Sequence, residues 1–271
     1  MSRYVLLFFS LLLCEAHAAS LRVAVSSPPL AWLVQQLGGD KVEVSVLLRP
    51  GDEPELFEPR PQQMQALAAS RLYFALGLPF ERQFLPRLDS AHLQVVALAS
   101  LQPQQDPHIW MSVVWMQLLA RRAALALQAA DPADAGYFGE RRRRLQDRLQ
   151  RLDADLRQQF AGLPPTQRVF LVEHPALGYF AHDYGLTQLA VEAEGREPGP
   201  AQLAQLLAQA RAAHIRRIFV ERQFAGRQAA TLATQLGAQV LVFDPLGADW
   251  EQVMRSLGRD LAASMRAMGT P

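Results

Sequence analysis

The chain has 271 residues, half of them hydrophobic, and a formal net charge of +1 at pH 7. Such a nearly neutral chain is not expected to use nucleic acid or an anionic membrane surface as its main partner. The hydrophobic content is sufficient for a substantial core, and the length suits two lobes better than one.

The N-terminus has the pattern of a secretory signal peptide. Arg3 precedes an apolar stretch over residues 4–13, and a small-x-small cleavage sequence ends at Ala18, so we predict that residues 1–18 are removed. The only cysteine, Cys14, lies within this segment, so the mature protein is expected to have neither a disulfide nor a thiolate ligand. The alternatives are a lipid-anchored cysteine, which the bulky residue before it disfavours, and a buried N-terminal helix. No later stretch is long and apolar enough to span a membrane, which predicts an exported protein.

The first half alternates between strand-like and helix-like patterns. The predicted strands are 21–26, 42–48, 72–76 and 95–98, and the predicted helices are 29–37, 61–69 and 111–130. Strands that alternate with helices are typical of a parallel sheet covered by helices. We therefore expect an α/β lobe over residues 19–130.

A long helix is predicted next, within a linking segment of residues 131–163. Asp131 and Pro132 suit the N-cap and first helical position, and Gly162 ends the pattern. Five apolar residues recur at three- and four-residue spacing: Leu145, Leu149, Leu152, Leu156 and Phe160. The helix would be roughly 45 Å long at 1.5 Å per residue, which favours a rigid strut between two lobes over a coiled-coil seam. The arginine run at residues 141–144 is interpreted as a solvated helix face, not a nucleic-acid patch.

The alternation then restarts over residues 164–271. The predicted strands are 169–173, 186–191, 215–220 and 240–243, and the predicted helices are 175–184, 200–213, 226–236 and 250–268. The sequence therefore predicts an α/β fold of two parallel-sheet lobes joined by one long backbone helix.

Four residues share a context that suggests a metal site: Glu55, His108, His174 and Asp244. Each lies at or just beyond the end of a predicted strand, and each has a proline beside it. Ligands of open parallel sheets bind beyond the carboxyl ends of the strands, so two lobes facing each other would each supply two of these side chains. Two imidazoles and two carboxylates complete a four-coordinate shell for a divalent cation.

Each of these residues also has a simpler interpretation. A single histidine at a strand end is more often a hydrogen-bonded structural residue, and Asp244 could belong only to a turn. Glu55 is one acid of an acidic loop, in which Glu53 or Glu58 could take its place. Only the joint placement of all four residues favours a metal site. The remaining histidines do not share this context and are interpreted as surface or structural residues.

At this point the sequence resembles a known family. The segments that carry the resemblance are PGDEPELFEPRP at 50–61, DPHIW at 106–110, HPALGYF at 174–180, YGL at 184–186, EPGP at 197–200 and DPLG at 244–247. In this order they are similar to the zinc- and manganese-specific solute-binding proteins of bacterial ABC importers. The resemblance implies a monomeric periplasmic protein that is not an enzyme. It would bind Zn²⁺ or Mn²⁺ as cargo and pass it to a membrane permease with its ATPase.

The sequence departs from the family pattern at the first ligand. Glu55 stands where the family usually has histidine, and the segment 99–105 lacks the His- and acid-rich loop of many zinc-binding members. Zinc binders of the family typically use three histidines, whereas manganese binders tend to use two histidines and two carboxylates. Because intrinsic affinity favours zinc over manganese for any nitrogen and oxygen ligand set, we predict zinc first and manganese second.

Two other functions remain open from the sequence. With histidine absent at position 55, the protein could be an accessory periplasmic metal carrier of the same fold. It could also be an exported zinc hydrolase that uses His108, His174 and one carboxylate, with Glu173 or Glu221 as the base. No H-E-x-x-H motif supports the hydrolase, and four protein ligands favour capture over an open catalytic site.

Overall fold

The computed structural model describes residues 20–49, 51–88, 92–99, 106–192, 198–224 and 227–268. The predicted signal peptide with Cys14, residues 100–105 of the short loop and Glu197 lie outside these residues. None of the helices in the described ranges is long and apolar enough to cross a membrane.

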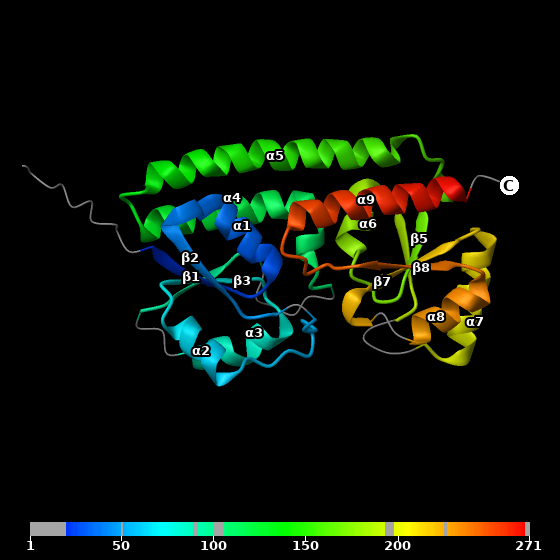
Figure 1. Cartoon of the computed structure of the whole chain (residues 1–271), viewed down its shortest axis with the longest axis horizontal. Coiled ribbons are helices and arrows are strands. Elements are labelled where there is room, and N and C mark those ends of the chain that lie inside the picture. Colours follow the sequence, from blue (N-terminus) through cyan, green and yellow to red (C-terminus); the bar gives the residue numbers. More distant parts are fainter. Residues whose placement is uncertain are drawn as a thin grey trace, which may run out of the picture.

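The N-terminal lobe is built on a parallel sheet with the strand order β2-β1-β3-β4. Its strands are β1 (Leu21–Val25), β2 (Val42–Val46), β3 (Leu72–Ala75) and β4 (Gln94–Ala97), and its helices are α1 (Pro28–Gly38), α2 (Pro61–Ala68), α3 (Pro79–Phe84) and α4 (Val113–Ala130). Helices α1 and α4 cover one face of the sheet, and α2 and α3 lie on the other (Figure 1). Because the four strands are parallel, their carboxyl ends all lie at one edge of the sheet, where the loops that follow β2 and β4 begin.

The C-terminal lobe repeats this design with the strand order β6-β5-β7-β8, again all parallel. Its strands are β5 (Val169–Val172), β6 (Thr187–Ala190), β7 (Arg217–Glu221) and β8 (Gln239–Phe243), and its helices are α6 (Gly178–Tyr184), α7 (Pro200–Ala212), α8 (Arg227–Leu236) and α9 (Trp250–Ala267). The prediction of two parallel-sheet lobes is confirmed.

A single long helix, α5 (Ala135–Ala161), runs along both lobes (Figure 1). Its 27 residues correspond to about 40 Å. The five apolar residues of the predicted stripe are all buried, and they face α4 and α1 at one end and α9 and α6 at the other. The periodic pattern therefore identified both the helix and its buried face.

The predicted start of this helix was wrong. Asp131 is the C-cap of α4, and α5 begins only at Ala135, after the N-cap Asp134. Because α4 and α5 pack side by side, the chain must reverse direction between them, and the residues around Pro132 form that turn. The short helix α3 was not predicted, because its six residues are too few to show a helical period.

One hydrophobic core connects the two lobes. It runs without interruption from Val23 in β1 through Leu149 in α5 to Phe219 in β7. A smaller second core lies between the C-terminal sheet and the helices α7 and α8. The lobes are therefore held together by packing along α5 as well as by the chain itself.

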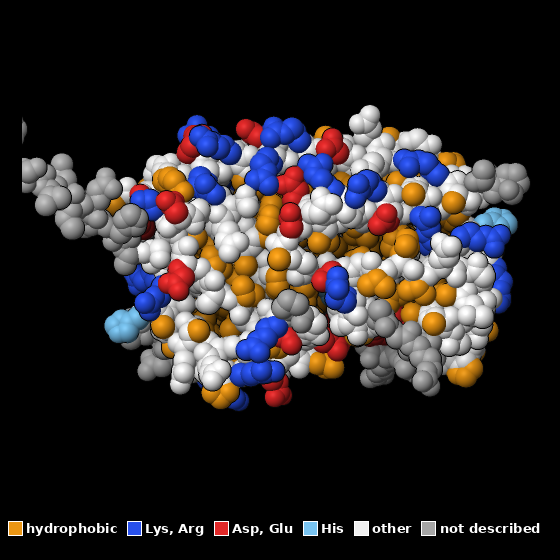
Figure 2. Space-filling model, in the orientation of Figure 1, with side chains coloured by type: hydrophobic (Ala, Val, Ile, Leu, Met, Phe, Trp, Pro, Cys, Tyr) orange, Lys and Arg blue, Asp and Glu red, His pale blue; other side chains and the backbone are white. Residues whose placement is uncertain are grey.

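The outer edge formed by α5 and α9 carries both signs of charge (Figure 2). Arg143 and Arg144 pair with Glu140, in agreement with a solvated face. Arg141 differs, because its guanidinium donates to the carbonyl oxygens of Gln35 and Gln36 at the end of α1.

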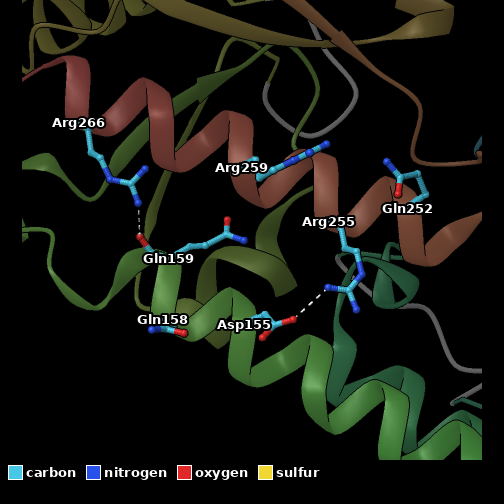
Figure 3. A pocket seen from close by; sticks show the side chains of 7 residues that line it. All are labelled: Asp155, Gln158, Gln159, Gln252, Arg255, Arg259 and Arg266. Carbon is cyan, nitrogen blue, oxygen red and sulfur yellow. Dashed lines mark hydrogen bonds and ion pairs between the residues drawn. The ribbon is translucent and has the colours of Figure 1, made fainter.

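Between α5 and α9 lies a polar pocket of about 560 Å³ (Figure 3). Arg255 pairs there with Asp155 at 3.0 Å, and Arg266 donates to the carbonyl oxygen of Gln159. The residues lining it are arginines, glutamines and one aspartate, and none of them is a predicted metal ligand.

Candidate metal centre

Glu55 is held by the loop that joins β2 to α2. The ring of Phe57 packs edge-on against Phe80 of α3, with 4.9 Å between ring centroids. The Gln63 amide donates to the carbonyl oxygen of Leu47, which fixes the two ends of the loop to each other. The Glu55 side chain between these anchors is 31% exposed, so it borders both the interior and solvent.

His108 is buried and oriented by its neighbour Asp106. One carboxylate oxygen of Asp106 accepts the backbone N–H of His108 at 2.8 Å and lies 2.9 Å from its Nδ1. A carboxylate at that distance holds the proton on Nδ1, which leaves Nε2 as a free donor of electrons to a metal.

The loop after His108 is tied to the other lobe by two tryptophans. The indole N–H of Trp110 donates to the carbonyl oxygen of Pro245 at 3.0 Å, and the indole N–H of Trp250 donates to the carbonyl oxygen of Trp110 at 2.7 Å. Both side chains are fully buried. This pair of hydrogen bonds places the loop that carries His108 against the segment that follows Asp244.

His174 has the same arrangement in the C-terminal lobe. It lies two residues beyond β5, is only 5% exposed, and its Nδ1 is 3.0 Å from a carboxylate oxygen of Glu192. The sheet sets this pairing, because the backbone N–H of Glu192 donates to the carbonyl oxygen of Glu173 where β6 continues alongside β5. As with His108, Nε2 is left for a metal.

Three of the four predicted ligands converge. Glu55, His108 and His174 each offer one ligand atom, and these atoms all lie within 4.8 Å of one another. The two imidazole rings meet edge to face with centroids 5.2 Å apart, and His174 Nε2 is 3.7 Å from a Glu55 oxygen. An ion between them would have ligands from both lobes.

Asp244 does not belong to this group. One of its carboxylate oxygens pairs with Nε of Arg222 at 3.1 Å, and the other accepts the backbone N–H of Leu246 at 3.0 Å. Its role as the fourth ligand therefore stays a prediction.

Further carboxylates surround His174. Glu221 is 2% exposed, and one of its oxygens has no hydrogen-bond partner among the described residues. Burial raises the pKa of Glu221 to about 7, and the nearby His174 partly opposes this rise. Burial also raises the pKa of Glu173, and the charge of Glu192 adds to that effect. A site with this excess of carboxylates suits a cation.

Asp106 and Glu192 were not predicted to take part in the site. Asp106 could have been found, because it lies two residues before His108. No feature of the sequence around Glu192 indicates this role, since Glu192 reaches His174 only because β5 and β6 are neighbours in the sheet. Of the other histidines, His182 is exposed and pairs with Asp183, and His92 and His214 lie outside the ligand group.

A comparison with known families identifies the family of the chain. The model of a family described as zinc-uptake complex component A, periplasmic, matches residues 23–264. The chain belongs to this family. The resemblance to the zinc- and manganese-specific solute-binding proteins of ABC importers is thereby confirmed.

Individual relatives and a solved structure resemble the chain over most of its length. The high-affinity zinc uptake system protein ZnuA of Bacillus subtilis is 24% identical over 272 residues, covering 90% of this chain and 84% of that protein. The manganese ABC transporter substrate-binding lipoprotein PsaA of Streptococcus pneumoniae is 23% identical, covering 80% and 79%. A crystal structure of ZnuA is 33% identical with a TM-score of 0.85, covering 91% of this chain and 99% of that one.

Proposed function

We propose that this protein captures a divalent transition-metal ion between its two lobes and delivers it to an ABC permease and its ATPase. The observation that carries the proposal is the convergence of Glu55, His108 and His174 from both lobes. Two imidazoles with protonated Nδ1 atoms and one carboxylate would supply three positions of a metal shell.

Asp244 is the fourth ligand in this proposal. With Glu55 it supplies two negative charges, which neutralise a divalent ion and make its burial tolerable. The shell is then supplied by the protein, as a binding protein requires, without the open position that a metallohydrolase needs.

Zinc is the proposed cargo, with manganese second. Imidazole suits zinc, whereas a second carboxylate makes the site harder and moves it toward manganese. The chain is similar to relatives named for each ion, so the choice rests on ligand chemistry. For any set of nitrogen and oxygen ligands, zinc binds more tightly than manganese.

The proposed location is the periplasm, after removal of residues 1–18. The ZnuA family is described as periplasmic, and some relatives are named lipoproteins.

Because α5 packs against both lobes, the closing motion on metal binding should be small. Small-angle scattering with and without metal measures this motion, and a change as large as that of a two-hinge binding protein would contradict it.

Calorimetric titration tests the proposed cargo. Metal-free protein lacking residues 1–18 should bind one Zn²⁺ per chain, more tightly than Mn²⁺. His174→Ala should weaken zinc binding by more than about 100-fold, because it removes a ligand and not only its partner. His182→Ala is the matched control, since His182 is exposed and outside the ligand group. Unchanged binding by His174→Ala would refute the site, and tighter binding of Mn²⁺ would refute the order of the ions.

A further inference from the structure

Asp244 is paired with a cationic side chain. The Nε atom of Arg222 lies 3.1 Å from one carboxylate oxygen, and the backbone N–H of Leu246 occupies the other. The sheet produces this contact. Glu221 of β7 is the register partner of Phe243 of β8, so Arg222 and Asp244 each follow by one residue on neighbouring parallel strands.

We propose that Arg222 competes with the metal ion for Asp244 and is released when the ion binds. The inference rests on the proposed function of the site. The guanidinium neutralises Asp244, which lies outside the group formed by Glu55, His108 and His174. In the loaded protein Asp244 turns to the ion, and Arg222 loses its partner.

The energies favour this exchange. The side chain of Arg222 is 67% exposed and that of Asp244 is 24% exposed, and ion pairs at such sites are weak because water screens them. A divalent ion coordinated by a carboxylate has twice the charge at a shorter distance, so it displaces the guanidinium. The positive charge of the ion also repels Arg222.

The exchange gives the loaded protein a feature that the empty protein lacks. Arg222 begins the short 3-10 helix Arg222–Phe224, and the ring of Phe224 lies 5.2 Å from that of His174. A freed guanidinium would therefore lie near His174, close to the ion. Its release reports that the site is occupied.

A double-mutant cycle tests the competition. Arg222→Gln should tighten zinc binding roughly two- to fivefold, the range of an exposed ion pair. Removing a positive charge near a cation also raises affinity through its field alone, so the same change is made in an Asp244→Asn background. There Arg222→Gln should raise affinity by less than it does in the unmodified protein, because the field effect remains but no carboxylate is left to be released.

Three outcomes of the cycle would overturn the proposal. These are weaker zinc binding by Arg222→Gln, an equal gain in both backgrounds, and undiminished affinity of Asp244→Asn alone. The last outcome would point to the buried Glu221 as the fourth ligand. Arg211→Gln is the control, because Arg211 lies near the end of α7, at the opposite edge of the sheet, and should leave affinity unchanged.

Nitrogen-15 NMR of the arginine Nε–H groups gives a direct readout. The Arg222 signal, assigned by its loss in Arg222→Gln, should exchange slowly with water in the empty protein and faster after Zn²⁺ is added. A signal that does not respond to bound zinc would refute the competition. Failure of the unmodified protein to bind any ion would instead refute the proposed function, so the two failures are distinguishable.

Discussion

Replacing Glu221 by glutamine is expected to stabilise the metal-free protein in a pH-dependent way. Burial raises the pKa of Glu221 to about 7 from the ordinary value of 4.5. The Glu221 carboxyl therefore loses its proton at lower pH in the unfolded chain than in the folded chain. Burial of the ionised Glu221 carboxylate therefore destabilises the folded state. This destabilisation is absent well below pH 4.5, grows between pH 4.5 and 7, and is complete above pH 7.

The magnitude of this effect follows from the size of the shift. A difference of about 2.5 pKa units corresponds to a penalty of about 3 kcal/mol at pH 8 and under about 1 kcal/mol at pH 5. Because glutamine carries no charge, Glu221→Gln should raise the free energy of unfolding by these amounts. For a chain of this size, the gain at pH 8 is a rise in melting temperature of roughly 6–12 °C.

Thermal unfolding in the presence of a chelator, at pH 5 and pH 8, measures the difference. Glu43→Gln is the matched control, because Glu43 is 68% exposed and its replacement should change stability by less than about 0.5 kcal/mol at either pH. An equal gain for Glu221→Gln at both pH values, or a loss at pH 8, would show that burial of the charge is not what destabilises this position.

Three further predictions concern the ligand shell and the packing of α9. Glu55→His should tighten zinc binding in calorimetric titrations, because it would give the proposed site a third imidazole, which suits zinc; weaker binding would mean that glutamate suits this position better than histidine. Asp106→Asn should weaken zinc binding by about 10- to 100-fold through loss of the partner that orients His108, a proposed ligand, and unchanged affinity would exclude that role. Gly258→Ala should lower the free energy of unfolding in denaturant titrations by about 1–3 kcal/mol, since the added carbon would lie 2.2 Å from the Leu156 side chain. Its control, Gly136→Ala on α5, meets no atom within 4 Å and should stabilise the protein by up to about 1 kcal/mol, so a similar sign for both would contradict the packing argument.

The fold could be predicted from the sequence because its signals are local. Apolar runs alternate with helical periods, and the stripe from Leu145 to Phe160 lies entirely within one helix. The boundary at Asp131 was less certain, because an aspartate before a proline satisfies the rules for a helix start as well as for a turn. Only the antiparallel packing of α4 and α5 decides between them.

The candidate site was predictable to the extent that strand ends determine it. Parallel strands place their carboxyl ends at one edge, which is why Glu55, His108 and His174 could be chosen before any contact was known. The pairing of Asp244 with Arg222 could not be predicted in the same way. It depends on the register between two neighbouring strands and on a competition between partners. No sequence motif indicates either of these.

The hydrogen bonds of Trp110 and Trp250 have a consequence for how the chain folds. They join residues separated by 135 and 140 positions in the sequence, so the loop that carries His108 cannot be locked until the last quarter of the polypeptide is available. Contacts of such long range form late, because the entropy of closing a large loop must first be overcome. The convergence of Glu55, His108 and His174 should therefore be among the final folding events, and a chain that lacks its last residues could not hold this group together.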